Sequence, residues 1–468
     1  MNLNGSGTRQ VFDGPKTAAG AAMRPVLYGR LMLCILMAGG VWLLTPGPGP
    51  LRSGIALFVL VGALWMTQAI ALAATALLVP LLSVSTGVQQ PQAALAAFAH
   101  PIIFLFLGGF ALAAAVQRQG LAKALAFSVL CAARGHRGAS IVLLAAVTAL
   151  VAMWMSNTAA AMLMVPIALG LIDAQEDTIG PREQRFTLLA VTYSTALGGM
   201  ASIVSTPPNA MAAAQVGAGF LEWFVRVAPL SLTMWLLMLA LLYATLRPSL
   251  AGRARTEAVA FKWTRERLWT ALIFSLAVIG WAAGGPLGRL LGVHTDVHAV
   301  VALATVAALV VSGVITWSDL EKEIQWGVLL LFGGGLALSE VMAASGGSRF
   351  LVERLLEVLQ GAPGPLVLLG VVAFVVVLSE LMSNTASAAL ALPLFMPLAP
   401  AFGMSPLSMA AAIALAASCG FMLPVATPPN ALVFGTGRVS QVVMMRSGWK
   451  LDLACILVIT TGAYSLWT

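Results

Sequence analysis

The chain has 468 residues, of which 60% are hydrophobic and 9% are charged, and its mean hydropathy is +0.95. A water-soluble domain carries roughly a quarter of its residues charged, so this composition excludes a cytosolic enzyme, a nucleic-acid binder and a disordered scaffold. The net charge of +8 comes from cations in short segments between apolar runs, as in cytoplasmic loops. The composition indicates a polytopic membrane protein.

Apolar runs recur along the whole chain. No charged residue occurs between Arg52 and Arg118 or between Glu380 and Arg438, and a crossing needs about 20 apolar residues. We expect an all-α protein with about eleven transmembrane helices. The expected crossings are 31–46, 54–69, 70–84, 101–116, 186–217, 224–246, 268–285, 297–316, 326–343, 404–437 and 451–467.

The basic loops set the expected orientation. The polar and basic segment 1–26 has no early apolar core with a small-residue cleavage site, so it is not a cleaved signal peptide. The distribution of Lys and Arg places the N-terminus in the cytoplasm and, after eleven crossings, the C-terminus outside. Segments 118–137 and 345–358 mix charged and apolar residues at helical spacing, which predicts amphipathic helices along the two surfaces.

Two apolar segments, 138–172 and 362–400, differ from the crossings. Ser156-Asn157-Thr158 divides the first into arms that are short for a crossing, and Pro166 interrupts the second arm. The second segment repeats the pattern with Ser383-Asn384-Thr385. These features predict two re-entrant hairpins whose polar tips lie at membrane depth.

The two halves of the chain carry the same motifs in the same order. Leu107-Gly108-Gly109 is echoed at Phe332-Gly333-Gly334 with an offset of 225, and the two Ser-Asn-Thr tips differ by 227. Thr-Pro-Pro-Asn occurs at 206–209 and again at 427–430, an offset of 221. Five expected crossings separate equivalent points, so the halves are inverted in the membrane, an arrangement typical of secondary transporters.

The motifs predict a site for cations and an anion together. Consecutive prolines remove two backbone donors, so each Thr-Pro-Pro-Asn breaks its helix and leaves free carbonyl and N–H groups. Carbonyls and the oxygens of Asn157 and Asn384 suit a hard monovalent cation, whereas hydroxyls and N–H groups at helix starts suit a carboxylate. No Lys or Arg lies within the four motifs, so a bound anion requires co-bound cations.

Other polar residues have simpler interpretations. Glu380 could lie at the membrane-facing rim or bond to neighbouring backbone, or it could form part of a cation site. The four cysteines lack metal-ligand spacing, so we expect free thiols that pack in apolar regions. The glycine runs at 108–109 and 333–335 lack the features of phosphate loops and predict close helix packing.

These doubled motifs resemble those of the divalent anion/sodium symporter family of di- and tricarboxylate transporters. The resemblance covers the chain after about residue 25. It implies an elevator-type transporter, a dimeric scaffold that carries a transport domain, and Na⁺ as the coupling ion. Many members carry a glycine where this chain has Ser205.

Residue by residue, the resemblance implies the following site. The first sodium site comprises Ser156, Asn157 and the Ser205 carbonyl, and the second comprises Ser379, Asn384 and carbonyls near Met382 and Ala426. The residues implied for substrate binding are Ser156, Asn157, Thr158, Ser383, Asn384, Thr385, Thr206, Pro207, Thr427 and Pro428.

The resulting expectation is a homodimeric sodium-coupled symporter of C4-dicarboxylates in the inner membrane. The expected parts are a cytoplasmic segment 1–26, scaffold 27–137 and 247–358, and transport-domain halves 138–246 and 362–468. The alternatives are a sodium-independent dicarboxylate exchanger, a symporter of citrate or sulfate, a channel and a membrane-embedded hydrolase. A channel would need a continuous polar pore, and a hydrolase would need a base near a nucleophile, yet no His lies within 50 residues of the second tip.

Overall fold

All eleven expected crossings contain helix in the computed structural model. The structure describes residues 19–174, 179–253, 261–284, 288, 290, 292, 297–359 and 361–467, and across these ranges the only strand pairing is an isolated bridge between His136 and Arg253. Residues 1–18 of the expected N-terminal segment lie outside the described residues. The helices of the first half are α1 (Ala19–Leu44), α2 (Gly49–Thr67), α3 (Leu72–Ser85), α4 (Pro91–Ala96), η1 (Ala97–Ala99), α5 (Pro101–Arg118), α6 (Leu121–Ala132), α7 (Arg137–Ala152), α8 (Asn157–Asp173), α9 (Pro181–Met200), α10 (Pro207–Val216) and α11 (Phe220–Leu246). Those of the second half are α12 (Arg265–Ala282), α14 (Val297–Val311), α15 (Trp317–Glu323), α16 (Trp326–Ala344), α17 (Gly347–Val358), α18 (Gly364–Leu381), α19 (Asn384–Phe395), η2 (Met396–Phe402), α20 (Pro406–Ala417), α21 (Pro428–Gly435) and α22 (Gln441–Trp467).

Length and composition identify candidate spans among these helices. Within the described ranges, seven stretches of at least 18 residues are apolar enough to cross a membrane. They are Leu27–Leu44, Gly49–Thr67, Pro91–Arg118, Phe220–Leu246, Trp326–Ala344, Gly364–Leu381 and Asn384–Phe402. The other expected crossings are shorter, broken or more polar helices, so the count of eleven stays a prediction.

Both expected hairpins form as pairs of helices joined at the Ser-Asn-Thr motifs. The arms of the first, α7 and α8, have 16 and 17 residues, so they are short as predicted. The arms of the second hairpin, Gly364–Leu381 and Asn384–Phe402, are long enough to cross a membrane. The prediction of short arms was therefore wrong for this hairpin. Its re-entrant character is supported by the shared motif and not by length.

The prolines in the returning arms behave differently from expectation. Pro166 was expected to interrupt the returning arm of the first hairpin, but it lies inside the continuous α8. Pro393 lies inside α19, and the helix changes to the tighter η2 only at Met396. A membrane helix tolerates a proline when neighbouring groups satisfy the freed carbonyl.

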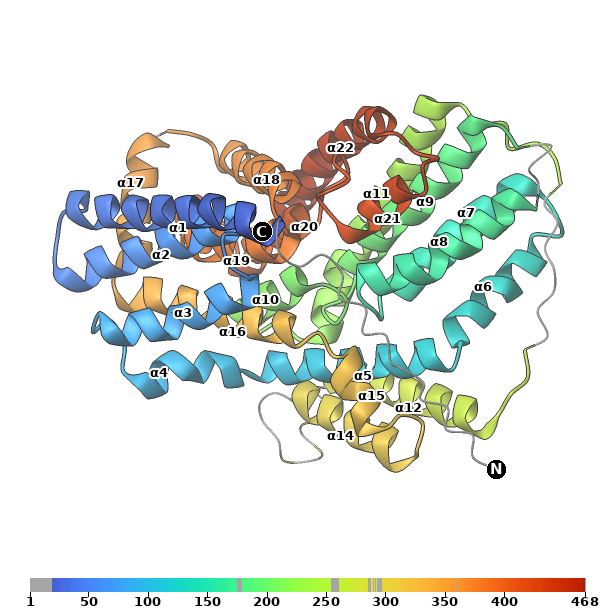
Figure 1. Cartoon of the computed structure of the whole chain (residues 1–468), viewed down its shortest axis with the longest axis horizontal. Coiled ribbons are helices and arrows are strands. Elements are labelled where there is room, and N and C mark those ends of the chain that lie inside the picture. The colour runs from blue at the N-terminus through green and yellow to red at the C-terminus, as the bar shows by residue number, and fades with distance from the viewer. Residues whose placement is uncertain are drawn as a thin grey trace, which may run out of the picture.

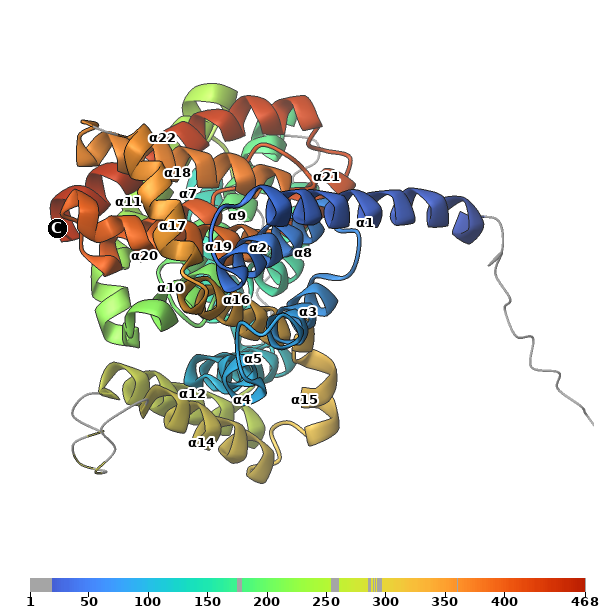
Figure 2. The ribbon, with the colours of Figure 1, turned by 90° about the vertical axis from the view of Figure 1, so that its left-hand side faces the viewer.

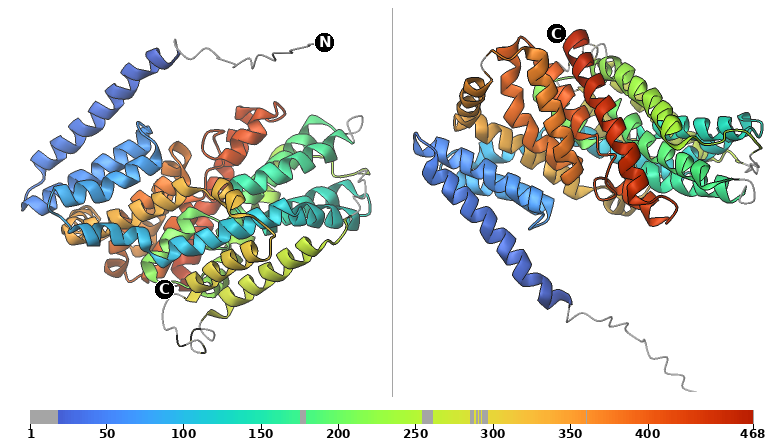
Figure 3. Two further views of the ribbon diagram at one scale, coloured as in Figure 1. Left: turned by 60° about the horizontal axis from the view of Figure 1, so that its bottom comes forward. Right: turned by 90° about the horizontal axis from the view of Figure 1, so that it is seen from above.

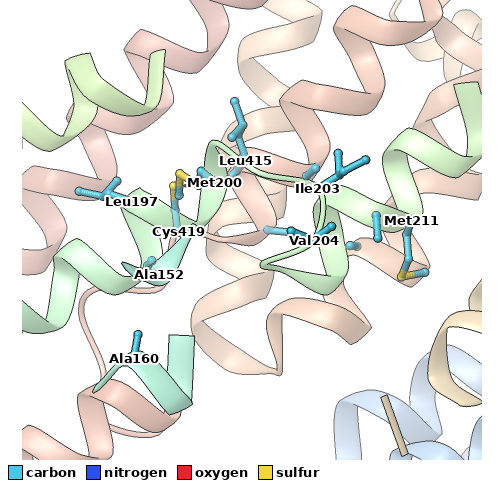
Figure 4. Close-up of a cluster of buried hydrophobic side chains, with 14 of the residues drawn as sticks. Ala152, Ala160, Leu197, Met200, Ile203, Val204, Met211, Leu415 and Cys419 are labelled. Carbon is cyan, nitrogen blue, oxygen red and sulfur yellow. Dashed lines mark hydrogen bonds between the residues drawn. The ribbon is translucent and has the colours of Figure 1, made fainter. Parts of the chain in front are cut away.

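Each Thr-Pro-Pro-Asn breaks its helix, as predicted. The first break separates α9 from α10 and the second separates α20 from α21. The helices beyond the breaks then pack across the two halves: α10 lies against α19 and α20, and α21 lies against α8 and α9. The end of α9 and the end of α20 contribute Leu197, Met200 and Leu415 to one buried apolar cluster (Figure 4).

The glycine runs permit close helix packing, as predicted. A Cβ added at Gly108 of α5 would lie 2.6 Å from the Ala302 Cβ of α14. One added at Gly334 of α16 would lie 2.4 Å from the Ala76 Cβ of α3. Each run therefore sits at a helix pair where no side chain fits between the backbones.

The segments 118–137 and 345–358 contain the short helices α6 and α17. Figure 1 shows α17 on the left of the molecule and α6 on the right. Helix α1 projects from the body in Figures 2 and 3, and only 11% of its apolar stretch is buried. The exposed face of α1 is apolar, with Leu36, Leu43 and Leu44 each more than 60% exposed.

Candidate functional site

Each of the four motifs begins a helix. Ser156 is the N-cap of α8 and Ser383 that of α19, and their hydroxyls accept hydrogen bonds from the N–H groups of Ala159 and Ala386, both at 3.3 Å. Thr206 is the N-cap of α10 and Thr427 that of α21. The prolines that follow suit the first helical turn because its N–H groups have no partner within the helix.

Four helix starts give the site a fixed positive potential. The N-terminus of a helix carries roughly half a positive charge and presents unpaired N–H groups, so it favours an anion. The cross-half packing of α10 on α19 and of α21 on α8 brings the broken helices against the hairpins. An arrangement of this kind favours an anion without a cationic side chain in the motifs.

The first half-site contains a free amide oxygen. Asn157 Oδ1 is buried and has no hydrogen-bond partner among the described residues. An ideal Cβ built on Gly199 would lie 2.6 Å from this oxygen and 2.7 Å from the Ser205 Oγ. Both oxygens therefore face the space beside Gly199, which any larger residue would fill.

Backbone carbonyls complete the first half-site. The Ser205 hydroxyl lies 2.5 Å from the Ala152 carbonyl and 3.3 Å from that of Met155. These neutral oxygens at short range are the ligands that a hard monovalent cation prefers, and an orphaned amide oxygen lacks a partner without one. The residues present therefore fit a sodium ion.

The second half-site is built from equivalent elements. The Ser379 hydroxyl donates to the Ala417 carbonyl at 2.6 Å and lies 3.1 Å from Asn384 Oδ1. A Cβ on Gly420 would lie 3.4 Å from the Ala426 Cβ and 3.6 Å from the Ser379 carbonyl. Ser379, Asn384 and Ala426 are therefore neighbours around the second break, and this oxygen-rich set also fits sodium.

The remaining predicted residues lie at the edges of these half-sites. Thr158 and Thr385 are half-buried second residues of α8 and α19, and Met382 is the buried C-cap of α18. Pro207 is half-buried whereas Pro428 is exposed. Within the described ranges nothing bonds the buried Thr206 Oγ1, but the Thr427 hydroxyl accepts from the Asn430 N–H at 3.3 Å.

The asparagines of Thr-Pro-Pro-Asn were not predicted as site residues, yet they hold the breaks together. Asn209 Nδ2 lies within hydrogen-bond distance of the carbonyls of Gly199, Met200 and Ser202, at 3.2, 2.9 and 2.9 Å. Asn430 Nδ2 does the same for Gly420 and Leu423, at 2.9 and 3.0 Å. Their place in the doubled motif could have identified both asparagines. From that motif, however, only the prolines and threonines were predicted as site residues.

Two further contacts lie close to the tips. Glu380 is buried, and its carboxylate accepts from the N–H groups of Met422 and Leu423 at 2.7 and 3.1 Å. The backbone-bonded interpretation of Glu380 therefore holds. Gln325, which precedes α16, donates from Nε2 to the Ser156 hydroxyl at 3.3 Å, a contact that no sequence pattern indicated.

Among the described residues, the ionisable side chains form no cluster typical of a divalent metal centre. No group of three or more His, Cys, Asp or Glu side chains with the placing of metal ligands occurs in the part of the chain that the structure describes. All four cysteines are free thiols, as predicted, and three of them are buried. The half-sites thus depend on neutral oxygens.

Comparison with known proteins identifies the family. The family model described as citrate transporter (CitMHS) matches residues 63–414 and 298–461. An uncharacterized transporter of Haemophilus influenzae is 38% identical over 423 residues, covering 89% of this chain and 92% of that protein. The sodium-dependent dicarboxylate transporter SdcS of Staphylococcus saprophyticus is 32% identical over 441 residues, covering 86% and 83%.

Solved structures share the fold. The YdaH transporter of Alcanivorax borkumensis superimposes with a TM-score of 0.57 at 17% identity, covering 80% of this chain and 87% of that one. MtrF of Neisseria gonorrhoeae gives a TM-score of 0.58 at 13% identity, covering 91% and 97%. The chain therefore belongs to the citrate transporter family, in keeping with its resemblance to the divalent anion/sodium symporters, and it is a multi-pass membrane transporter and not an enzyme.

Proposed function

We propose that the protein is a sodium-coupled symporter of C4-dicarboxylates such as succinate, malate and fumarate across the inner membrane. The observation that carries the proposal is the pairing of two neutral-oxygen half-sites with four helix N-termini. The N-termini favour the carboxylates, and co-bound sodium ions neutralise the rest of their charge. Relatives named as sodium-dependent dicarboxylate transporters support this assignment.

Each half-site is proposed to hold one sodium ion. Ser156, Asn157 and Ser205 would hold the first ion, and Ser379, Asn384 and the carbonyls of Met382 and Ala426 the second. The substrate carboxylates would then meet the hydroxyls and N–H groups at the helix starts of both halves. The residues in this role are Ser156, Asn157, Thr158, Thr206, Pro207, Ser383, Asn384, Thr385, Thr427 and Pro428.

The proposed transport cycle moves both half-sites as one body. The cross-half packing of α10 and α21 supports a single transport domain of 138–246 with 362–468, and 27–137 with 247–358 would form the scaffold. In this elevator model an inverted repeat exposes one site to each side in turn. The uncovered apolar face of α1 would meet a second copy of the chain or lipid. The N-terminus would be cytoplasmic and the C-terminus external, as the distribution of Lys and Arg favours.

Uptake of labelled succinate into proteoliposomes tests the coupling. We expect uptake with sodium outside and its collapse when potassium replaces sodium, because the motifs supply no cationic side chain to neutralise the substrate. Equal uptake in both salts that also requires internal dicarboxylate would overturn symport in favour of exchange. Competition by excess unlabelled citrate or sulfate, with no competition by malate, would instead reassign the substrate.

A further inference from the structure

A cavity of about 600 Å³ lies outside the proposed substrate site, where the first hairpin meets the scaffold. Its walls come from the end of α5, from α6, from the inner end of α7, from α12 and from the segment that precedes α12. Trp154 and Met155, which immediately precede the first tip, line the cavity together with Phe274 and Ser275 of α12. The Trp154 and Phe274 rings meet edge to face at 5.2 Å.

The cavity offers hydrocarbon and aromatic surface and little polar surface. Its two hydroxyl-bearing lining residues both donate within their own helices: Ser128 to the Ala124 carbonyl at 2.9 Å and Ser275 to the Ala271 carbonyl at 2.8 Å. A dicarboxylate would lose its hydration here without compensating hydrogen bonds. An acyl chain that enters the cavity from water loses only unfavourable contact with water. One that enters from the bilayer moves between similarly apolar surroundings.

Cations border the same cavity on two elements. Lys262 lies between Phe261 and Trp263, which both line the cavity. The Arg267 guanidinium of α12 lies 4.3 Å above the Phe261 ring. The cavity therefore borders a surface that favours an anionic group.

The cavity extends inward from this basic border. Ser275 lies ten residues into α12, about 15 Å from its first residue at 1.5 Å per residue. That is about half of a hydrocarbon core of roughly 30 Å. The exposed side chains of Leu125, Leu150 and Trp263 line the cavity, so it opens to the outside of the molecule.

We propose that this cavity binds one anionic phospholipid, with an acyl chain against Trp154 and Phe274 and the headgroup beside Lys262 and Arg267. The apolar walls select a lipid over a soluble anion, and the cations select an anionic headgroup over a zwitterionic one. The lipid would contact both α12 and Met155, the residue before Ser156. Its binding would therefore act directly on the first hairpin. A regulatory effect on uptake rests on the proposed transport function, whereas binding does not.

Native mass spectrometry of the purified protein tests binding separately from transport. The full chain, released in a mild detergent, is incubated with equimolar phosphatidylglycerol and phosphatidylcholine of identical acyl chains. We expect one retained phosphatidylglycerol per chain, preferred at least about tenfold over phosphatidylcholine because two surface cations contribute. Equal retention of the two lipids, or retention of neither, would overturn the proposal.

Variants separate the headgroup from the acyl chain. Lys262→Gln combined with Arg267→Gln should abolish the preference, whereas Arg349→Gln on α17 should keep it. Ser275→Trp should remove the retained lipid by filling the cavity, whereas Thr233→Trp on the exposed face of α11 should not. Ala124→Trp fills the cavity from the α6 side should Ser275→Trp fail to fold, and an unchanged lipid count in either folded variant would contradict the assigned site.

Discussion

Ser205 and Ser379 each bring a hydroxyl to their half-site, but they do not occupy equivalent positions of the repeat. The offset of 227 between the tips aligns Ala152 with Ser379, and the offset of 221 between the breaks aligns Ala426 with Ser205. In the first half the hydroxyl lies on the break and reaches the hairpin, at 2.5 Å from the Ala152 carbonyl. In the second it lies on the hairpin arm and reaches α20. The chain thus keeps one hydroxyl per half-site.

This exchange predicts a rescue. Ser205→Ala should raise the sodium concentration for half-maximal uptake about tenfold, since a polar ligand contact contributes about 1–1.5 kcal/mol. Adding Ala152→Ser reproduces the arrangement of the second half-site and should restore most of the affinity. The sodium dependence of succinate uptake measures both, with Ser140→Ala on the same hairpin arm as the control. A double variant no better than Ser205→Ala would contradict the exchange.

The sequence located the tips but not all the contacts around them. Doubling made the Ser-Asn-Thr motifs stand out, because one polar triplet at membrane depth has many explanations and two at matched offsets have few. Ser205 was assigned through its carbonyl alone, since only the folded chain places its hydroxyl beside Ala152 and Gly199. The contact from Gln325 to Ser156 joins residues 169 positions apart, and no local pattern encodes such a pair.

At the scale of single elements, the broken helices depend on the asparagine amides. In the first break, Asn209 donates to the Met200 and Ser202 carbonyls in place of the missing helical turn. We expect Asn209→Asp to abolish uptake and to lower stability by about 1–3 kcal/mol, because a carboxylate cannot donate to these buried carbonyls. Thermal unfolding of the purified protein measures the loss.

A matched change of amide to acid on the same helix controls for charge. Gln215 lies at the other end of α10 and donates to the Ser339 hydroxyl at 2.6 Å, away from the break. Gln215→Glu should therefore retain more stability than Asn209→Asp. Equal losses of stability in the two variants would show that an acid destabilises α10 at either end. The hydrogen bonds of Asn209 at the break would then not explain the effect.

The short helix α15 is tied to the end of α5 by an ion pair. Arg118 lies against the Asp319 carboxylate and, with the Thr316 hydroxyl, holds the pKa of Asp319 at about 2. Since this pKa is depressed below its ordinary value of 3.8, the stabilisation is present above about pH 4 and is lost as the pH falls towards 2.

Asp319→Asn should remove this part of the acid sensitivity. The unfolding midpoint of the purified variant should change less between pH 5 and pH 2 than that of the wild type, at roughly constant ionic strength. Glu323→Gln, which removes an exposed acid from the same helix, should leave the wild-type profile. A variant profile that overlays the wild type would mean that the ion pair does not contribute.

The helix boundaries also show which structural features can be predicted from a sequence motif and which cannot. Thr-Pro-Pro-Asn predicted both breaks correctly, because two consecutive prolines remove donors that no single neighbour can replace. The same reasoning failed for Pro166, since a single proline costs one hydrogen bond and α8 is surrounded by α7, α9 and α21. Whether a proline ends a helix depends on these neighbours.

At the scale of the whole molecule, α2 and α19 connect the proposed scaffold to the proposed moving body. A Cβ on Gly62 of α2 would lie 3.1 Å from the Leu390 Cδ2 of α19. A Gly62→Cys and Leu390→Cys pair should cross-link, because the smaller side chain at 390 makes room for the added Cβ. In the elevator model this bond holds one facing state, so oxidation should stop uptake and reduction should restore it.

Each single cysteine variant is the control, and mass spectrometry gives the fraction cross-linked. Uptake at the wild-type rate by a fully cross-linked population would argue for local opening of the hairpins in place of movement of the whole domain.

The crossed packing of α10 on α19 and α20 has a consequence for biogenesis. Helix α10 ends at Val216 and its partner α19 starts at Asn384, so 167 residues lie between them during synthesis. At 5–20 residues per second the ribosome needs roughly 8 to 34 seconds to supply the partner. Throughout that interval the first broken helix lies in the membrane without its packing surface, so insertion factors and quality-control proteases meet this transporter while its first half is still incomplete.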